Sequence, residues 1–375
     1  MEKILLSSPH MSKNSMKYMQ EAFDTNWVAP AGPHIDLFEK NLSSISDGNH
    51  VAVLSSGTAA IHLALILLNV KKDDIVICSS FTFAASANPI IYQGALPVFI
   101  DSEKETWNMD PVLLEQAIVH QIKLDKKPKA IILVHLYGFP AKMDEIVEIA
   151  KKYEIPIIED AAEALGSMYN NQPMGSFGDF GIYSFNGNKI ITSSSGGAII
   201  SNSMEYIKKA KFLSTQAKDD FPHYEHSEIG YNYRMSNICA AIGLGQLEVL
   251  FERVNKRRSI FNYYKDKLSS IPFLSFVEDI DGFYSNRWLT TIIVSEDSVI
   301  NREDIRLRLL ENNIESRPLW KPMHIQPVFS SHKSYLNGVS EDLFKRGLCL
   351  PSGSIIKQKD LERVVSVIKN LFNES

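Results

Sequence analysis

Residues 180–197 read FGIYSFNGNKIITSSSGG: an apolar run typical of a strand, then a polar turn that holds a single lysine, Lys189. No other charged residue lies within several positions of Lys189 in either direction. Burial of such a lysine lowers the pKa of its amine, and a neutral amine can attack a carbonyl group. A solvated loop lysine is the ordinary alternative. The stretch therefore indicates a sheet strand with a candidate reactive amine after its carboxyl end.

The chain around this stretch alternates apolar, strand-like runs with amphipathic, helix-like segments. This alternation is typical of an α/β protein with a mainly parallel sheet, and continuously apolar runs indicate strands that are covered on both faces. Strands are expected at residues 51–54, 75–78, 97–100, 130–134, 156–158, 180–184 and 197–201. Helices are expected at residues 58–68, 83–92, 110–121, 142–153 and 204–212, with one or two long helices in 235–267.

The pattern changes from about Ser270, where strand-like runs become shorter. Residues 288–294 read as a strand, and residues 302–312 and 359–372 read as helices. We therefore expect a large domain over residues 1–250 and a smaller α+β domain over residues 251–375. Ligands of open α/β sheets bind at the carboxyl ends of the strands, so the site is expected there, with the Pro-rich loop 317–329 near its mouth.

Charge and cysteine usage exclude several classes of protein. The 39 Lys and Arg against 44 Asp and Glu give a net charge of -5, so no global basic field would attract nucleic acid or an anionic membrane. The basic run KRR at residues 256–258 is expected to be a solvated helix face. Three cysteines without CxxC spacing argue against a zinc site and a disulfide framework. We expect a soluble, cytoplasmic protein without a metal and without a membrane span.

Residues 55–58, SSGT, lie between an expected strand and an expected helix. The free N–H groups at a helix N-terminus attract anions, and Gly57 lets an anion approach the backbone closely, so this junction is a candidate phosphate site. A simple N-cap formed by Ser or Thr is the alternative.

Asp160 follows the expected strand at 156–158 and precedes the turn AAEALG. A buried carboxylate at this place can pair with a protonated heterocyclic nitrogen. The alternative is a capping residue for the following turn. Glu163 lies three residues further on, close to Asp160 if the turn is helical. Because Asp160 and Lys189 follow two successive strands, both are expected to face one crevice.

Seven segments, in this order along the chain, resemble the DegT/DnrJ/StrS family of pyridoxal phosphate (PLP)-dependent sugar aminotransferases. They are SSGTAAIHLAL, SFTFAASANPI, VHLYGFP, IIEDAAEALG, GSFGDFGIYSFNGNKIITSSSGG, IGYNYRMSNICAAIGLGQL and RPLWKPMH. The resemblance implies fold type I, the aspartate aminotransferase fold, with a large, mainly parallel-sheet domain and a smaller α+β C-terminal domain. Residues 192–197 read TSSSGG where many relatives have TTGEGG or TTSGGG, a small polar departure.

The resemblance also implies roles for individual residues. Lys189 resembles the Schiff-base lysine, Asp160 the partner of the pyridine nitrogen, and Glu163 the residue near O3′ of PLP. Phe83 matches the aromatic residue that stacks on the ring. The remaining cofactor-binding positions are Gly57, Thr58 and Ser184 at the phosphate, and Asn232, which reaches the phosphate from a second subunit and so implies a homodimer with shared sites. Residues in segments that line the sugar-nucleotide site of relatives are Asn26, Trp27, Asn186, Arg234, Lys321 and His324.

The reaction implied by the resemblance is a two-half transamination from L-glutamate to a keto-sugar nucleotide, with Lys189 as the general acid and base. The run SFNGNKIIT resembles the branch that aminates C4 of UDP-4-keto-6-deoxy-N-acetylglucosamine for bacillosamine-type glycans. The alternatives are a GDP-4-keto-6-deoxymannose 4-aminotransferase (perosamine synthase), whose relatives often carry His in place of Asn186, and a C3 aminotransferase. The family also has a dehydratase branch with His in place of the lysine, so Lys189 favours transamination. From a different class, a non-catalytic PLP-binding module is also open, although Lys189, Asp160 and the phosphate-binding set are all present.

Overall fold

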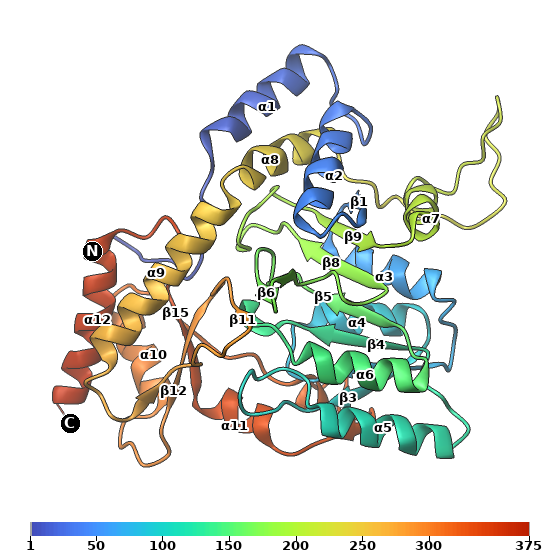
Figure 1. Cartoon of the computed structure of the whole chain (residues 1–375). Helices are drawn as coiled ribbons and strands as arrows, with labels where there is room; N and C mark the ends of the chain where they lie inside the picture. Colours follow the sequence, from blue (N-terminus) through green and yellow to red (C-terminus); the bar gives the residue numbers. More distant parts are fainter. Residues whose placement is uncertain (1, 375) are drawn as a thin grey trace.

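The computed structural model of the chain describes residues 2–374 and has an eight-stranded sheet at its centre (Figure 1). The strand order is β1-β9-β8-β5-β4-β2-β3-β14, and every neighbouring pair is parallel except the two pairs that β9 forms. The strands are β1 (His50–Leu54), β2 (Ile75–Ser79), β3 (Leu96–Ile100), β4 (Ala130–Val134), β5 (Ile157–Asp160), β8 (Phe180–Ser184), β9 (Gly197–Ser201) and β14 (Ser334–Tyr335). The expected mainly parallel sheet is confirmed.

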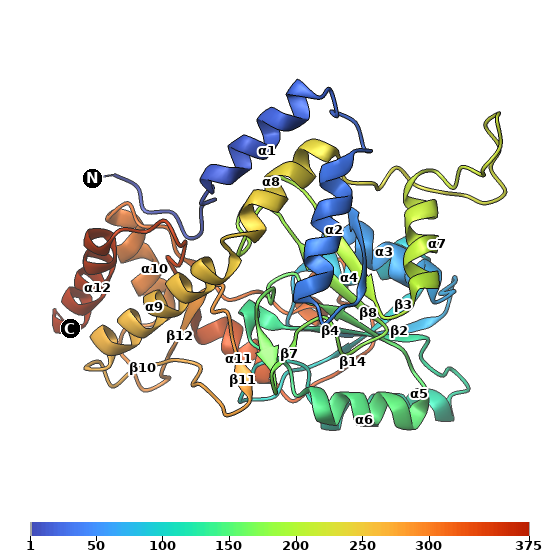
Figure 2. The same cartoon turned by 45° about the horizontal axis from the view of Figure 1, so that its top comes forward.

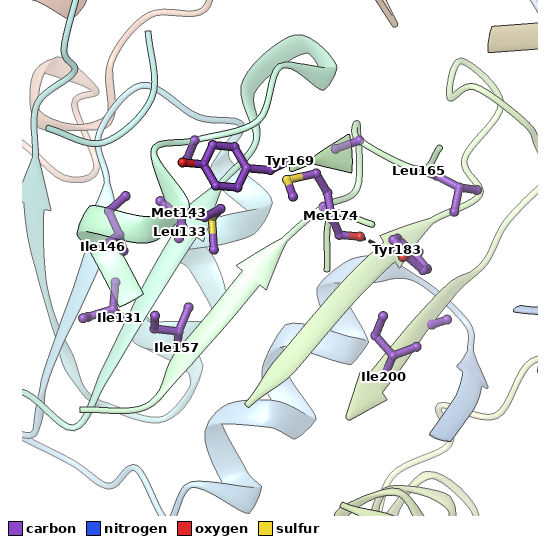
Figure 3. Packing of buried hydrophobic residues seen from close by; sticks show 14 of the residues in the cluster. Ile131, Leu133, Met143, Ile146, Ile157, Leu165, Tyr169, Met174, Tyr183 and Ile200 are labelled. Atoms are coloured by element: carbon purple, nitrogen blue, oxygen red, sulfur yellow. Dashed lines mark hydrogen bonds between the residues drawn. The ribbon is translucent and has the colours of Figure 1, made fainter. Parts of the chain in front are cut away.

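Successive residues of these strands pack on opposite faces of the sheet, as the period of two requires. Ile131 and Leu133 of β4 belong to one core cluster and Ala130 and Ile132 to another. Helices α2 (Pro33–Ile45), α5 (Pro111–Lys123), α6 (Met143–Tyr153) and α8 (Asn237–Leu247) contribute to the first cluster, part of which is drawn in Figure 3. Helices α3 (Gly57–Leu67), α4 (Ala84–Tyr92) and α7 (Met204–Ser214) contribute to the second. Apolar residues on both faces explain why these runs read as continuously hydrophobic.

The expected long helical region at 235–267 consists of two helices, α8 and α9 (Leu250–Leu268). Ser236 caps α8 by accepting a hydrogen bond from the Cys239 N–H at 3.2 Å. Helix α1 (Lys13–Asp24), which we did not expect, packs along α8 in Figures 1 and 2. Helix α2 was also not expected, although Pro33 at its first turn is a residue typical of a helix start.

A smaller antiparallel sheet, β10-β12-β15-β13, lies in the C-terminal part of the chain. Its strands are β10 (Leu274–Ser275), β12 (Thr290–Val294), β15 (Gly347–Leu350) and β13 (Arg317–Pro318). Helices α9, α10 (Arg302–Glu311) and α12 (Gln358–Asn373) form a core cluster with it. The structure also has helix α11 (Val339–Arg346) and a small sheet of β11 (Phe283–Tyr284), β6 (Met168–Tyr169) and β7 (Gln172–Pro173).

Two backbone pairings join residues from opposite sides of the expected domain boundary. Ile4 forms a bridge with Ile314, and β14 pairs with β3 of the large sheet. The division at residues 250 and 251 therefore stays a prediction. A long excursion between α7 and α8 projects from the body in both views, closed at its base by a bridge between Thr215 and Asn232 (Figures 1 and 2). Among residues 2–374, no helix is both long and apolar enough to cross a membrane.

Candidate active site

A cavity of about 840 Å³ lies at the carboxyl ends of the large sheet's parallel strands. Its wall combines strand ends of the large sheet with residues 315–321 and Trp288 from the C-terminal part. Nine of the predicted site residues line it: Gly57, Thr58, Phe83, Asp160, Glu163, Ser184, Asn186, Lys189 and Lys321. The expected position of the site, at the strand ends of an open α/β sheet, agrees with this cavity.

Lys189 lies in the turn after β8, where its own N–H donates to the Asn186 carbonyl at 3.1 Å. Its side chain is only 12% exposed, and its Nζ lies 3.3 Å from Oε1 of Glu163. The same Nζ lies 4.3 Å from the ring centroid of Trp288, within the range of a cation–π contact. The indole N–H of Trp288 donates to the Asn188 carbonyl at 2.7 Å, so the ring is fixed next to the amine. Lys189 is therefore not a solvated loop lysine.

Glu163 is the acidic partner of this amine. Its Oε2 accepts a hydrogen bond from the Tyr137 N–H at 2.7 Å, and its side chain is buried. Burial raises the pKa of Glu163 to about 7, although the charge of Lys189 and the Tyr137 N–H act in the opposite direction. A carboxyl group with this pKa holds or releases a proton near neutral pH. Glu163 can therefore give or take a proton next to Lys189 at the cavity wall.

Asp160 ends β5 and is buried. Its Oδ2 accepts a hydrogen bond from the Ser86 hydroxyl at 2.6 Å, and its Oδ1 accepts one from the Ala162 N–H at 3.2 Å. Thr82 lies 2.7 Å from Ser86, so two hydroxyl groups stand behind the carboxylate. The hydrogen bonds from Ser86 and Ala162 fix the direction of the carboxyl group. The capping bond to Ala162 was the alternative interpretation of Asp160, and it is present as well.

The start of α3 is the candidate phosphate site. Ser56 accepts a hydrogen bond from the Ala59 N–H at 3.0 Å, so the alternative N-cap interpretation is confirmed, and anion binding stays a prediction. The first N–H groups of a helix have no partner inside the helix, which leaves those of Gly57 and Thr58 at the cavity. A Cβ atom at Gly197 would lie 2.3 Å from the Gly57 nitrogen. Gly197, the last residue of TSSSGG, is thus required for the close packing of the helix start.

Five predicted residues do not line the cavity of their own chain. Arg234 donates to Glu39 at 2.6 Å and to the Val53 carbonyl at 3.0 Å. His324 lies 2.6 Å from the Ser80 hydroxyl and 3.1 Å from Glu341. The other three are exposed: Asn26, Trp27 and Asn232. Binding roles for these five stay predictions, and Arg234 and His324 have evident structural partners.

Several residues of the cavity wall were not predicted: the N-terminal residues 5–9 line it, as do Trp288 and Cys349. Arg317 and Trp320 also line it, and they belong to the Pro-rich loop 317–329 that was expected near the mouth of the site. The Leu6 N–H donates to Glu315 at 3.0 Å, and Ser7 donates to the Asn188 carbonyl at 2.8 Å. We call residues 5–9 the N-terminal strap. Nothing in its sequence, LLSSP, distinguishes it from an ordinary loop.

The basic run at 256–258 is only partly the solvated face that we expected. Lys256 is exposed, but Arg257 is 2% exposed, so the interpretation was wrong for Arg257. Helix α9 is long and its middle faces the protein interior, so every third or fourth residue is buried whatever its charge. Within residues 2–374, no group of three or more His, Cys, Asp and Glu is placed to hold a metal ion.

The sequence matches the model of the DegT/DnrJ/EryC1/StrS aminotransferase family over residues 9–369. The chain belongs to this family. It is 52% identical to EpsN of Bacillus subtilis, a protein named as a PLP-dependent aminotransferase, over 99% of this chain and 96% of EpsN. GDP-perosamine synthase of Escherichia coli O157:H7 is 36% identical over the full length of both chains. A Campylobacter jejuni UDP-4-amino-4,6-dideoxy-N-acetyl-beta-L-altrosamine transaminase is 33% identical over 92% of each chain.

Solved structures agree with the family membership. A DegT/DnrJ/EryC1/StrS aminotransferase from Brucella abortus superposes with a TM-score of 0.89 and 29% identity, covering 96% of this chain and 95% of that one. Spr1654 of Streptococcus pneumoniae in its PLP form has a TM-score of 0.91 and 25% identity, over 100% of this chain and 99% of that one. The protein therefore has fold type I and is a PLP-dependent sugar aminotransferase, which overturns the non-catalytic PLP-binding module as an alternative.

The residues of the cavity fit PLP. The cofactor presents an aldehyde, a ring nitrogen that must stay protonated and a phosphate, and once bound it supplies an electron sink. The cavity offers one amine at Lys189, one buried carboxylate at Asp160 and a helix N-terminus at Gly57 and Thr58. All three lie on the wall of one space.

Proposed function

We propose that this enzyme transfers the amino group of L-glutamate to C4 of a 4-keto-6-deoxy sugar nucleotide, with UDP-4-keto-6-deoxy-N-acetylhexosamine as the first candidate. The observation that carries the proposal is the placement of Lys189, Glu163 and Asp160 on the wall of one cavity. In this proposal Lys189 holds the cofactor and then moves the proton at the reacting carbon, because it is tethered beside it. Asp160 keeps the ring nitrogen protonated, and Phe83 covers the ring.

The charges around the cavity support a sugar nucleotide as substrate. Lys189 pairs with Glu163, and Arg317 pairs with Glu315 at 2.8 Å. Lys321 also lines the cavity and forms no ion pair within residues 2–374. An unpaired cation at this place suits the diphosphate of a nucleotide, since the protein's net charge of -5 would otherwise repel it.

A GDP-linked keto-sugar is the second candidate. GDP-perosamine synthase of Escherichia coli matches the whole chain, whereas the Campylobacter UDP-sugar transaminase matches 92% of it. We propose that Asn186 helps to select the UDP-linked over the GDP-linked acceptor. Asn186 lines the cavity, and perosamine synthases often have His in its place. A side chain of different size and charge there would change which sugar fits.

The test is a direct comparison of the two keto-sugar nucleotides as acceptors, with L-glutamate as donor. We expect kcat/KM for the UDP-linked acceptor to exceed that for the GDP-linked one, and the Asn186→His variant to reduce the difference. Asn202→His, at an exposed position outside the cavity, is the control and should leave the ratio unchanged. Equal rates with both acceptors, or preference for the GDP-linked one, would refute the first candidate.

We further propose a homodimer in which each site receives Asn232 from the other subunit. Asn232 is exposed and lies outside the cavity of its own chain, at the base of the projecting excursion. That excursion exposes large apolar side chains, among them Tyr224 at 82% and Ile229 at 86%. Exposed apolar groups of this size favour burial against another surface, and a second copy is the partner that the proposal requires.

A further inference from the structure

Arg257 of α9 is a buried cation with an unusual set of partners. Its side chain forms no ion pair with a carboxylate anywhere in residues 2–374, and its Nε has no hydrogen-bond partner there. Burial lowers the pKa of Arg257 to about 9, far below the ordinary value for a guanidinium group. A buried charge without an opposite charge costs free energy, so the side chain must be held by hydrogen bonds to neutral oxygens.

Three oxygens accept those hydrogen bonds, each from a different segment of the cavity wall. Nη2 donates to the Ser7 hydroxyl of the N-terminal strap at 3.0 Å and to the Lys189 carbonyl at 3.4 Å. Nη1 donates to the Trp288 carbonyl. The planar fork of a guanidinium group can bond several acceptors at fixed angles, which the point charge of a lysine cannot do.

These three bonds belong to one connected network. Ser7 donates to the Asn188 carbonyl at 2.8 Å, and the Trp288 indole donates to the same carbonyl at 2.7 Å. Arg257 therefore fixes the Lys189 carbonyl directly. It fixes the Asn188 carbonyl indirectly, through Ser7 and Trp288. The Trp288 ring in turn lies 4.3 Å from Nζ of Lys189.

We propose that Arg257 is a positioning residue. It holds the backbone of Lys189, the ring of Trp288 and the N-terminal strap in fixed positions relative to one another. It acts through Lys189, and the proposal rests on the assignment of Lys189 as the reacting amine. A lysine side chain has four rotatable bonds, so its amine has a defined place only if its backbone is fixed. Misplacement of a reacting group by about 1 Å can cost roughly a hundredfold in rate.

The test compares Arg257→Lys, which keeps the charge but loses the fork, with Arg253→Lys as control. Arg253 lies one turn earlier on α9, is also buried and pairs with Glu252. Hydrogen exchange is measured by mass spectrometry on the full-length, PLP-loaded enzyme. In Arg257→Lys we expect exchange at least about tenfold faster in peptides that cover residues 4–9 and 185–192, and unchanged exchange in α6 and β4. Arg253→Lys should match the wild type in all of these peptides.

Kinetics provides the second measurement. Arg257→Lys should lower kcat by roughly 10- to 100-fold, while the KM for the sugar nucleotide stays within about threefold, because the amine and not the substrate site is displaced. Ser7→Ala removes one acceptor on an accessible segment and should show the same local exchange pattern to a smaller degree. Wild-type exchange at residues 4–9 and 185–192 in Arg257→Lys would overturn the proposal, as would faster exchange spread evenly over the chain. The hydrogen-exchange result does not depend on which sugar is aminated. A negative exchange result would therefore refute the role of Arg257 without bearing on the proposed acceptor.

Discussion

Oε1 of Glu163 lies 3.3 Å from Nζ of Lys189 on the wall of the cavity, with both side chains almost fully buried. Burial raises the pKa of Glu163 to about 7, so its carboxylate and its carboxylic acid forms are close in free energy near neutral pH. A carboxyl group that can hold or release a proton suits a place beside an amine that has to give and take a proton during one reaction cycle.

Lys189→Ala should abolish transamination. Loss of a positioned proton donor and acceptor alone costs roughly 10²- to 10⁴-fold, and the attachment point of the cofactor disappears as well. Borohydride treatment followed by mass spectrometry should find the cofactor fixed on Lys189 in the wild type and nowhere in the variant. Lys189→Arg keeps the charge but cannot supply a neutral amine, so it should be equally inactive. Full turnover in either variant would contradict the assignment.

The raised pKa of Glu163 predicts a pH-dependent stability of the apoprotein. Below pH 4.5 the carboxyl group is protonated in the folded and the unfolded chain, so its contribution is fully present. Between pH 4.5 and about 7 the unfolded chain releases the proton while the folded chain keeps it, so stability falls as pH rises. The whole effect is at most about 3 kcal/mol, and it levels off above the folded pKa.

Glu163→Gln removes this titration. The difference in free energy of unfolding between wild type and variant, measured by urea titration of the apoprotein, should therefore change across pH 4.5 to 7 and be constant above it. Glu315→Gln is the control, because burial raises the pKa of Glu315 but the Leu6 N–H and Arg317 more than offset it. Its effect should be confined to the acid side of pH 4.5. A pH-independent difference for Glu163→Gln would show that the carboxyl group has an ordinary pKa.

Asp160→Asn should retain the cofactor but lower kcat by roughly 10²- to 10³-fold, the range for loss of one preorganised electrostatic contact. The amide has nearly the shape of the carboxylate, yet it cannot stabilise a positive charge on the ring nitrogen. Asp179→Asn is the matched control. Asp179 accepts a hydrogen bond from the Ile157 N–H at 2.9 Å, at the opposite end of β5. An equal loss of kcat in both variants would mean that Asp160 acts only on the fold.

The sequence was sufficient for seven of the eight strands of the large sheet, all except β14, and for the residues at the ends of those seven. Runs such as Ala130–Val134 and Phe180–Ser184 are apolar on both faces of the sheet, so their bounds are sharp and agree with the structure. The parallel order then brings Asp160 and Lys189 to one edge. Local patterns encode these elements because one periodicity dominates each of them.

Contacts between distant segments could not be predicted in this way. The N-terminal strap and Trp288 reach the cavity across about 180 and 100 positions from the lysine turn. Arg257 was interpreted as solvated because its neighbours are charged, although the side of α9 that it occupies is covered by the strap and the turn of Lys189. Burial of one residue in a charged run depends on tertiary packing, which no local pattern records.

Lys321→Ala should raise the KM for the sugar nucleotide and leave the half-reaction with L-glutamate unchanged. Lys321 is the cavity cation without an ion pair in the described chain, and only the nucleotide brings a diphosphate. A charge-assisted contact of this kind is worth about 1.5 to 3 kcal/mol, which corresponds to a change of roughly 10- to 100-fold. Lys345→Ala is the control, since Lys345 is 76% exposed on α11 and does not line the cavity. Slower reaction with L-glutamate in Lys321→Ala would contradict a role limited to the nucleotide.

Mixing the Asn232→Ala and Lys189→Ala variants tests the shared site. If Asn232 completes the site of the other subunit, Asn232→Ala should weaken cofactor binding and lower activity, and Lys189→Ala should be inactive. A hybrid dimer then has one site with both changes and one with the wild-type Lys189 and the wild-type Asn232. After random exchange of subunits, half of the dimers are hybrids with one intact site each, so roughly a quarter of the wild-type activity should return. Activity that stays at the mean of the two variants would place Asn232 and Lys189 in the same subunit's site or in no common site.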